Sequence, residues 1–159
     1  MRRNNDGISV SLSSNKGNRR VSFTGNVLSG GHLHAYNIYQ LTVTGNVIEA
    51  PARAIEMIKV SENTVVSGNV LRATASDQSG SLVSATHHTT GKPGSLTIAG
   101  NQFHSVSMNG AMVNVTSARD VLVSANSFTW EPVSQLATTT LVTIYGITQP
   151  TDAILVTGN

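Results

Sequence analysis

The most constraining feature of the sequence is a short unit that recurs along the whole chain: a brief alternating run, a Gly-Asn pair and a second brief run. The unit is clearest in QLTVTGNVIEA (residues 40–50) and NTVVSGNVLRA (residues 63–73). The pair recurs as Gly25-Asn26, Gly45-Asn46, Gly68-Asn69, Gly100-Asn101, Ala125-Asn126 and Gly158-Asn159. Successive asparagines are 20, 23, 32, 25 and 33 residues apart, so a fixed part alternates with a part of variable length.

The fixed part is apolar at the same three positions of nearly every unit. Three residues before the asparagine stand Phe23, Val43, Val66, Ile98, Val123 and Val156. Five residues before it stand Val21, Leu41, Thr64, Leu96, Val121 and Ile154, among which Thr64 is the one polar residue. Two residues after it stand Leu28, Ile48, Leu71, Phe103 and Phe128. A period of two is typical of β-strands that bury one side.

Each unit holds a third alternating run, upstream of the other two. These runs are GISVSL (7–12), HLHAYNI (32–38), AIEMIKV (54–60), SLVSAT (81–86), AMVNVT (111–116) and LVTIYG (141–146). Three short strands in each unit predict a coil in which equivalent strands stack in parallel, about 4.8 Å apart. The stacked interior is one apolar column, so no single unit is stable alone.

The Gly-Asn pair explains how the chain turns between two of these strands. Glycine accepts backbone angles that other residues resist. The asparagine side chain can bond to the backbone and to the asparagine of the next unit, which satisfies polar groups at the corner. The predicted ladder comprises Asn26, Asn46, Asn69, Asn101, Asn126 and Asn159. Ala125 in place of glycine suggests a corner with a weaker conformational demand.

This pattern of strand, Gly-Asn corner and strand resembles the right-handed parallel β-helix of the pectin-lyase-like superfamily, over essentially the whole chain. The resemblance implies an all-β, right-handed, single-stranded parallel β-helix of about six coils. In the family's convention the asparagine ladder marks the turn between the second and third strands, which makes residues 8–12 and their equivalents the first strand. A β-sandwich also uses short alternating strands, but it would not keep one asparagine corner in register through six units.

The resemblance predicts a fold and leaves the activity open, because the superfamily includes pectate lyases, polygalacturonases, epimerases, phage tailspikes and adhesive passenger domains. Residues 1–159 are expected to form one β-helix domain. Because the sequence stops at a corner, we expect a fragment or module of a longer chain, or ends covered by partner chains.

Composition excludes several kinds of partner. The net charge is only +2, and no basic stripe interleaves with aromatic residues, so nucleic-acid binding is not expected. No apolar run reaches the roughly 20 residues that a membrane helix needs. The chain has no cysteine, which excludes disulfides and thiolate metal sites. His87-His88 lie on opposite sides if extended, so we expect no metal site there and no cofactor.

In this superfamily the ligand cleft usually lies on the outer face of the first strands and the loops before them. On that face the alignment places Ser9, His34, Glu56, Ser84, Asn114 and Thr143. We take Glu56 and His34 as the candidate catalytic residues. Glycoside hydrolysis needs two carboxylates, and Glu49 or Asp77 would be the partner of Glu56. The alternative is that Glu56 forms an ordinary surface pair with His34 or Lys59.

Other charged and aromatic residues are candidate substrate contacts: Glu49, Arg53, Arg72, Asp77, His104, Trp130 and Glu131. Trp130, in the longest loop, is either a sugar-stacking platform beside Glu131 or a loop anchor. The column Glu49, Arg72 and His104 could equally stabilise strand register through alternating charge. A calcium-dependent lyase is disfavoured because no acidic cluster is present. A metal-free lyase would use His34 or His104 with Arg53 or Arg72.

The sequence therefore predicts a carbohydrate-recognising β-helix module of a phage tailspike-like or secreted polysaccharide-active protein, with catalysis left open. Its partner would be a polysaccharide, and its location extracellular or on a virion surface. The alternative is a non-catalytic structural or adhesive shaft. Outward apolar stripes (Val65, Leu122 and Leu155; Val27, Val47 and Val70) predict a homo-oligomer, and a trimer if the tailspike resemblance holds.

Overall fold

The computed structural model describes residues 9–18, 20–59, 62–75, 80–86, 94–106, 111–116, 118–131, 140–145 and 153–159, with only the backbone for residues 14–18. All regular structure in these residues is β-strand. Among them there is no helix with the length and hydrophobicity needed to cross a bilayer. Asp77 and the pair His87-His88 lie outside the described residues.

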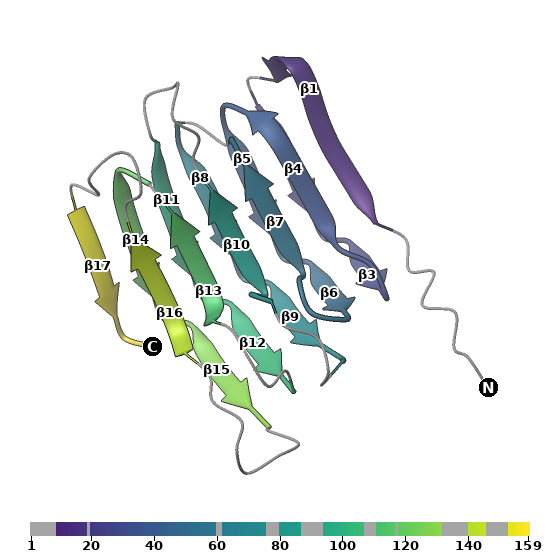
Figure 1. Cartoon of the computed structure of the whole chain (residues 1–159), viewed down its shortest axis with the longest axis vertical. Helices are drawn as coiled ribbons and strands as arrows, with labels where there is room; N and C mark the ends of the chain where they lie inside the picture. The colour runs from purple at the N-terminus through teal and green to yellow at the C-terminus, as the bar shows by residue number, and fades with distance from the viewer. Residues whose placement is uncertain are drawn as a thin grey trace.

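The strands form three parallel sheets, which we call A, B and C (Figure 1). Sheet A is ordered β1 (Val10–Asn18), β4 (Leu33–Ile38), β7 (Ile55–Ile58), β10 (Val83–Thr86), β13 (Ala111–Thr116) and β16 (Thr140–Tyr145). Sheet B is ordered β2 (Val21–Thr24), β5 (Leu41–Thr44), β8 (Thr64–Ser67), β11 (Ser95–Ala99), β14 (Asp120–Ser124) and β17 (Ala153–Thr157). Sheet C is ordered β3 (Val27–Ser29), β6 (Val47–Ala50), β9 (Val70–Ala73), β12 (Gln102–Ser105) and β15 (Ser127–Trp130).

The chain visits the sheets in a fixed order, A then B then C. Each of the first five sequence units adds one strand to each sheet, and the sixth adds one to sheet A and one to sheet B. Every strand therefore pairs with the strand three positions along the chain, always in parallel. In Figure 1 the β1 end and the β17 end lie on opposite sides of the molecule, as a stack built unit by unit requires. The prediction of an all-β chain of repeated, stacked parallel strands is confirmed, and the arrangement is compatible with a parallel β-helix.

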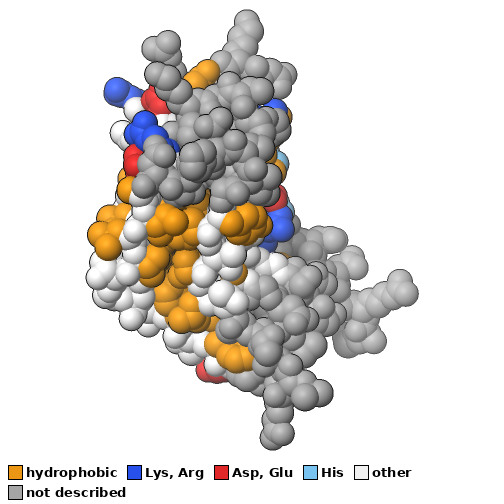
Figure 2. Space-filling model, turned by 60° about the vertical axis from the view of Figure 1, so that its left-hand side comes forward, with side chains coloured by type: hydrophobic (Ala, Val, Ile, Leu, Met, Phe, Trp, Pro, Cys, Tyr) orange, Lys and Arg blue, Asp and Glu red, His pale blue; other side chains and the backbone are white. Residues whose placement is uncertain are grey.

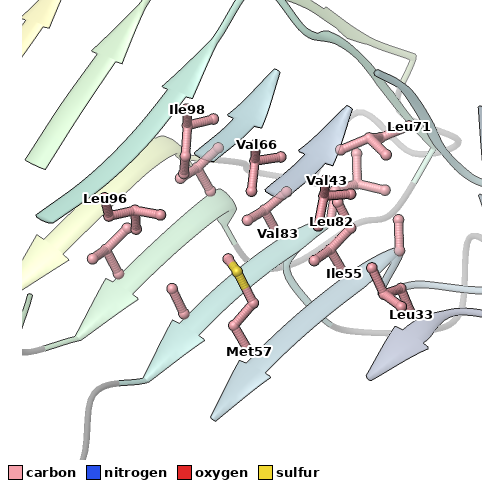
Figure 3. Packing of buried hydrophobic residues seen from close by; sticks show 14 of the residues in the cluster. Leu33, Val43, Ile55, Met57, Val66, Leu71, Leu82, Val83, Leu96 and Ile98 are labelled. Carbon is pink, nitrogen blue, oxygen red and sulfur yellow. The ribbon is translucent and has the colours of Figure 1, made fainter. Parts of the chain in front are cut away.

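The apolar columns of the sequence coincide with the observed register. Phe23, Val43, Val66, Ile98, Val123 and Val156 are consecutive partners in sheet B. Leu28, Ile48, Leu71, Phe103 and Phe128 are consecutive partners in sheet C. Inward side chains of all three sheets meet in one core, where those labelled in Figure 3 point toward one another. The phenyl rings of Phe103 and Phe128 stack at 4.8 Å between centroids, so the core is continuous across units.

One sequence register was wrong by two residues. The first strand of sheet A pairs Ser11, not Ser9, with His34. The Ser9 hydroxyl instead contacts His32 Nδ1 at 3.1 Å. Ser9 and Ser11 lie on the same face of a strand, so alternation alone could not distinguish them.

Six asparagines stack at the corners between sheets B and C and satisfy the buried backbone there. At each step the backbone N–H and the Nδ2 of one asparagine donate to the Oδ1 of the next, from Asn26 to Asn159, over 2.9–3.1 Å. The second Nδ2 hydrogen reaches a strand carbonyl, as from Asn69 to Val43 O at 3.0 Å. Asn46, Asn69 and Asn101 are each only 1% exposed, so water cannot replace these bonds.

The corners demand a left-handed backbone conformation at the residue before the asparagine. The five glycines there have φ between 61° and 69°. Ala125 has φ 52°, so its corner has the same shape, and the prediction of a weaker demand there was wrong. Alanine is strained in this region by about 1–2 kcal/mol. The unit tolerates that cost because the stacked strands on either side fix the corner.

We expect Asn69→Ala to lower the free energy of unfolding by about 1–3 kcal/mol, because the buried Asn46 N–H loses its acceptor. Asn26→Ala is the matched control, since Asn26 Oδ1 accepts no hydrogen bond from the described residues; its cost should stay below about 1 kcal/mol. Urea denaturation followed by circular dichroism measures both. Equal midpoints for Asn69→Ala and the parent would contradict the role assigned to the stack.

Ala125→Gly should stabilise the protein by about 0.5–1 kcal/mol, because relief of the strained backbone exceeds the added entropy of the unfolded chain. Gly68→Ala is the reciprocal variant. A Cβ there would meet no atom within 4 Å, so its expected loss of about 1–2 kcal/mol comes from φ alone. Thermal unfolding of both variants tests this. A lower melting temperature for Ala125→Gly would show that the corner does not carry this strain.

Candidate functional site

The outer face of sheet A carries a line of polar side chains, one from each strand, which we call the polar row: Ser11, His34, Glu56, Ser84, Asn114 and Thr143. The row runs across the strands because residues in register lie about 4.8 Å apart on neighbouring parallel strands. Ser11 is exposed, and the other five are half-buried. The row was predicted from the sequence, except that Ser9 was expected at the position that Ser11 occupies.

The two candidate catalytic residues lie side by side in this row. His34 on β4 and Glu56 on β7 are register partners. His34 Nε2 is 3.8 Å from Glu56 Oε2, which is a close contact but no hydrogen bond. Their side chains are 32% and 21% exposed, so both can be reached from the solvent. The alternation of β4 and β7 turns both side chains outward, away from the core formed by Leu33 and Ile55.

Arg53 completes the cluster. It precedes β7, and its guanidinium Nη1 forms an ion pair with Glu56 Oε1. The sequence suggested His34 or Lys59 as the partner of Glu56. The structure instead gives Glu56 the neighbours Arg53 and His34, whereas the Lys59 ammonium lies 5.2 Å from the centroid of the Tyr36 ring. The cluster therefore holds one carboxylate between a guanidinium and an imidazole.

Aromatic rings flank His34 within its own strand. The rings of His32 and Tyr36 each have their centroid 6.5 Å from that of His34. Residues two apart on a strand share a face, so this trio forms a strip along β4 at right angles to the polar row. A ligand over His34 would thus meet polarisable surface in one direction and hydrogen-bonding groups in the other.

A second charged strip lies on the outer face of sheet C. Glu49, Arg72, His104 and Thr129 are register partners there, as the sequence predicted. Arg72 Nη1 is 3.4 Å from Glu49 Oε1, and His104 Nε2 is 4.0 Å from Glu131 Oε2. Such exposed pairs add little stability, roughly 0–1 kcal/mol each, but they favour the native register. As ligand contacts, these residues stay predictions.

The placement of Trp130 in a long loop was wrong. Trp130 is the last residue of β15 and the register partner of Ser105, a buried inward position. Its side chain is partly buried and packs against the core. Alternation along β15 therefore separates it from the outward Thr129, and the structure favours the anchoring interpretation of this ring. The sequence suggested a loop because Trp130 follows Phe128, where the part of variable length was expected to begin.

The second carboxylate that hydrolysis needs is not beside Glu56 among the described residues. Glu49 belongs to sheet C and pairs with Arg72, whereas Glu56 belongs to sheet A. Within the part of the chain that the structure describes, no three His, Cys, Asp or Glu side chains are arranged to hold a metal ion. The described cluster can thus orient and hydrogen-bond a ligand, and it offers one acid or base with an adjacent imidazole.

Asn114 is a further candidate contact that the sequence pattern did not single out. It lies in the polar row on β13, and its Oδ1 is buried without a hydrogen-bond partner from the part of the chain that the structure describes. His34 Nε2 has the same property. The alignment already placed Asn114 on the outer face, but an unsatisfied atom is a property of packing that the alignment could not show.

Comparison with models of known protein families, with curated proteins and with solved structures finds no match to this chain.

Proposed function

We propose that this chain is a carbohydrate-recognising module built on a right-handed parallel β-helix of the pectin-lyase-like kind. The observation that carries the proposal is the cluster of Arg53, Glu56 and His34 on the outer face of sheet A. Guanidinium, carboxylate and imidazole groups, set among serine and asparagine side chains, are hydrogen-bonding partners for sugar hydroxyls. The wound, repetitive scaffold holds His34, Glu56 and the rest of the polar row on rigid strands, which favours recognition of an extended polymer.

The proposal extends to the surroundings in which such modules work. A phage tailspike or a secreted polysaccharide-active protein presents its glycan site outside the cell or on a virion surface. The ten Lys and Arg and eight Asp and Glu residues of the chain leave it nearly neutral, and its sequence is rich in Ser, Thr and Asn. Within the site, Glu56 is the residue proposed to act as acid or base and His34 the residue that would exchange protons with it.

The primary test incubates the purified chain with a panel of bacterial capsular, neutral and acidic plant polysaccharides. Affinity electrophoresis reports retention, a reducing-end assay reports cleavage, and ultraviolet absorbance reports unsaturated uronates. We expect retention by at least one glycan. New reducing ends without unsaturation would identify a hydrolase, and unsaturation would identify a lyase. No retention and no cleavage on any member would refute carbohydrate recognition and favour the structural or adhesive shaft.

Glu56→Gln should weaken retention, or abolish cleavage if cleavage occurs, while leaving the fold intact. The side chain keeps its shape, and the lost ion pair with Arg53 is partly exposed, so the cost to stability should stay below about 1 kcal/mol. Asp120→Asn is the matched control, since Asp120 pairs with Arg119 at the start of β14 on sheet B. If Glu56→Gln and the parent bind and turn over every glycan equally, the site is not at Glu56.

We also propose that the chain forms a homo-oligomer, and a trimer in the tailspike-like arrangement. Several outward or edge apolar side chains are largely exposed, including Val27 (75%) on sheet C and Leu155 (57%) on sheet B. Figure 2, turned so that the β17 side comes forward, shows hydrophobic side chains gathered over that side. Val65, Leu122, Val47 and Val70 are half-buried, so they contribute less to this surface than the sequence suggested.

Light scattering after size exclusion should give the mass of a trimer, because burying these side chains against a second copy removes apolar surface from water. The double variant Val27→Lys and Leu155→Lys should shift the population toward monomer. The double variant Ser22→Lys and Thr42→Lys, at outward polar positions of sheet B, is the matched control and should keep the parent's mass. A monomer at every concentration tested would exclude the oligomer.

A further inference from the structure

The polar row contains two buried polar atoms that find no hydrogen-bond partner among the described residues. They are His34 Nε2 on β4 and Asn114 Oδ1 on β13. Folding has already removed water from these atoms, at a cost of roughly 1–3 kcal/mol for each unsatisfied group. A ligand that supplies the missing partners would recover that cost. At these atoms, therefore, a hydrogen bond from a ligand contributes most to the free energy of binding.

The two atoms lie on one line with other hydrogen-bonding groups between them. His34, Glu56, Ser84 and Asn114 occupy successive strands in register, β4, β7, β10 and β13. Three steps between neighbouring parallel strands separate His34 from Asn114, or about 14 Å along the row. A small compact ligand cannot reach both, whereas an oligosaccharide of several units laid across the strands can.

The charges around the row do not favour an acidic ligand. Glu56 is the one acidic residue of the row, and the guanidinium of Arg53 is paired with it. The Lys59 ammonium lies over the Tyr36 ring. A uronate or sulfate on the row would therefore meet a carboxylate whose cation is already engaged. The asparagine amide and the serine hydroxyl, by contrast, both donate and accept hydrogen bonds, as sugar hydroxyls do.

We infer that the polar row binds a neutral, hydroxyl-rich glycan that runs across the strands, parallel to the direction in which they stack, with Asn114 and His34 as specificity-determining contacts at its two ends. This inference rests on the proposed carbohydrate recognition and adds the charge class of the ligand and the role of Asn114. The side chain of His34 is 32% exposed and Asn114 is half-buried, so a ligand laid on the row meets both side chains.

The test measures retention of the parent and of Asn114→Ala by affinity electrophoresis in dextran, galactomannan and soluble glucan, and in polygalacturonate, alginate and hyaluronan. We expect retention in at least one neutral glycan and none in the acidic set. Asn114→Ala should weaken that retention about 5- to 10-fold, the value of one hydrogen bond. His34→Ala should weaken it similarly. Thr97→Ala, at a half-buried outward position of sheet B, should leave it unchanged.

Thermal unfolding separates binding from folding in these variants. Because Asn114 Oδ1 has no partner to lose among the described residues, Asn114→Ala should melt at the same temperature as the parent or higher. A lower melting temperature would show a structural role and overturn the assignment. Retention only in acidic glycans, or neutral retention insensitive to both substitutions, would overturn the inference while leaving carbohydrate recognition in place. No retention in either set would refute both.

Discussion

The structure depends on hydrogen bonds that pass from one unit to the next at the buried corner. Each asparagine of the stack except Asn159, the last, gives its backbone N–H and one amide hydrogen to the Oδ1 of the asparagine that follows, so the corner of one unit is completed by its neighbour. A unit without that neighbour would leave a buried N–H unsatisfied at a cost comparable to much of a unit's own stability. The apolar columns depend on neighbouring units in the same way, because each inward side chain is covered by the side chains of the units above and below it. Stability is therefore a property of the stack, and cooperativity between units follows from the corner chemistry.

This dependence divides the positions of a unit into constrained and free ones. The glycine, the asparagine and the three apolar columns must repeat, since every unit must fit the same two neighbours. Ala125 shows how firm the constraint is: the residue differs, yet its φ of 52° follows the glycines. Thr64 shows the same constraint at a core position. It occupies a column of Val, Leu and Ile, is 2% exposed, and its buried hydroxyl has no hydrogen-bond partner in the described ranges. The outward positions carry no such requirement, which leaves them available for recognition.

The same division explains how much could be predicted from the sequence. The three strands of each unit, their parallel stacking and the partners in the apolar columns follow from period-two alternation anchored at one asparagine. The predicted register becomes less certain with distance from that asparagine. On the first strand, Ser9 and Ser11 share a face, and Ser9 was predicted at the position that Ser11 occupies. The row of Glu49, Arg72 and His104 was predicted because it lies close to the corner. The Arg53–Glu56 pair was not, because Arg53 lies in a connection of variable length whose path no repeat specifies. Trp130 was misplaced for the same reason, at the point where a strand runs on into such a connection.

A periodic interior also dictates what kind of ligand its outer face suits. Inward residues must be in register, so outward residues are brought into register as well, and polar side chains on successive strands form lines with a spacing near 4.8 Å. Such a line offers equivalent contacts at equal steps. It is longest across the strands, because sheet A has six strands, and shortest along one strand, which has only a few outward positions. A polymer with its own repeat can engage several steps at once, so weak single contacts add up through effective concentration. The unsatisfied atoms at His34 and Asn114 bracket one such stretch. The chemistry of recognition is thus set by the few outward residues that differ between units. Its geometry is set by the asparagine stack, which keeps every unit in register with the next.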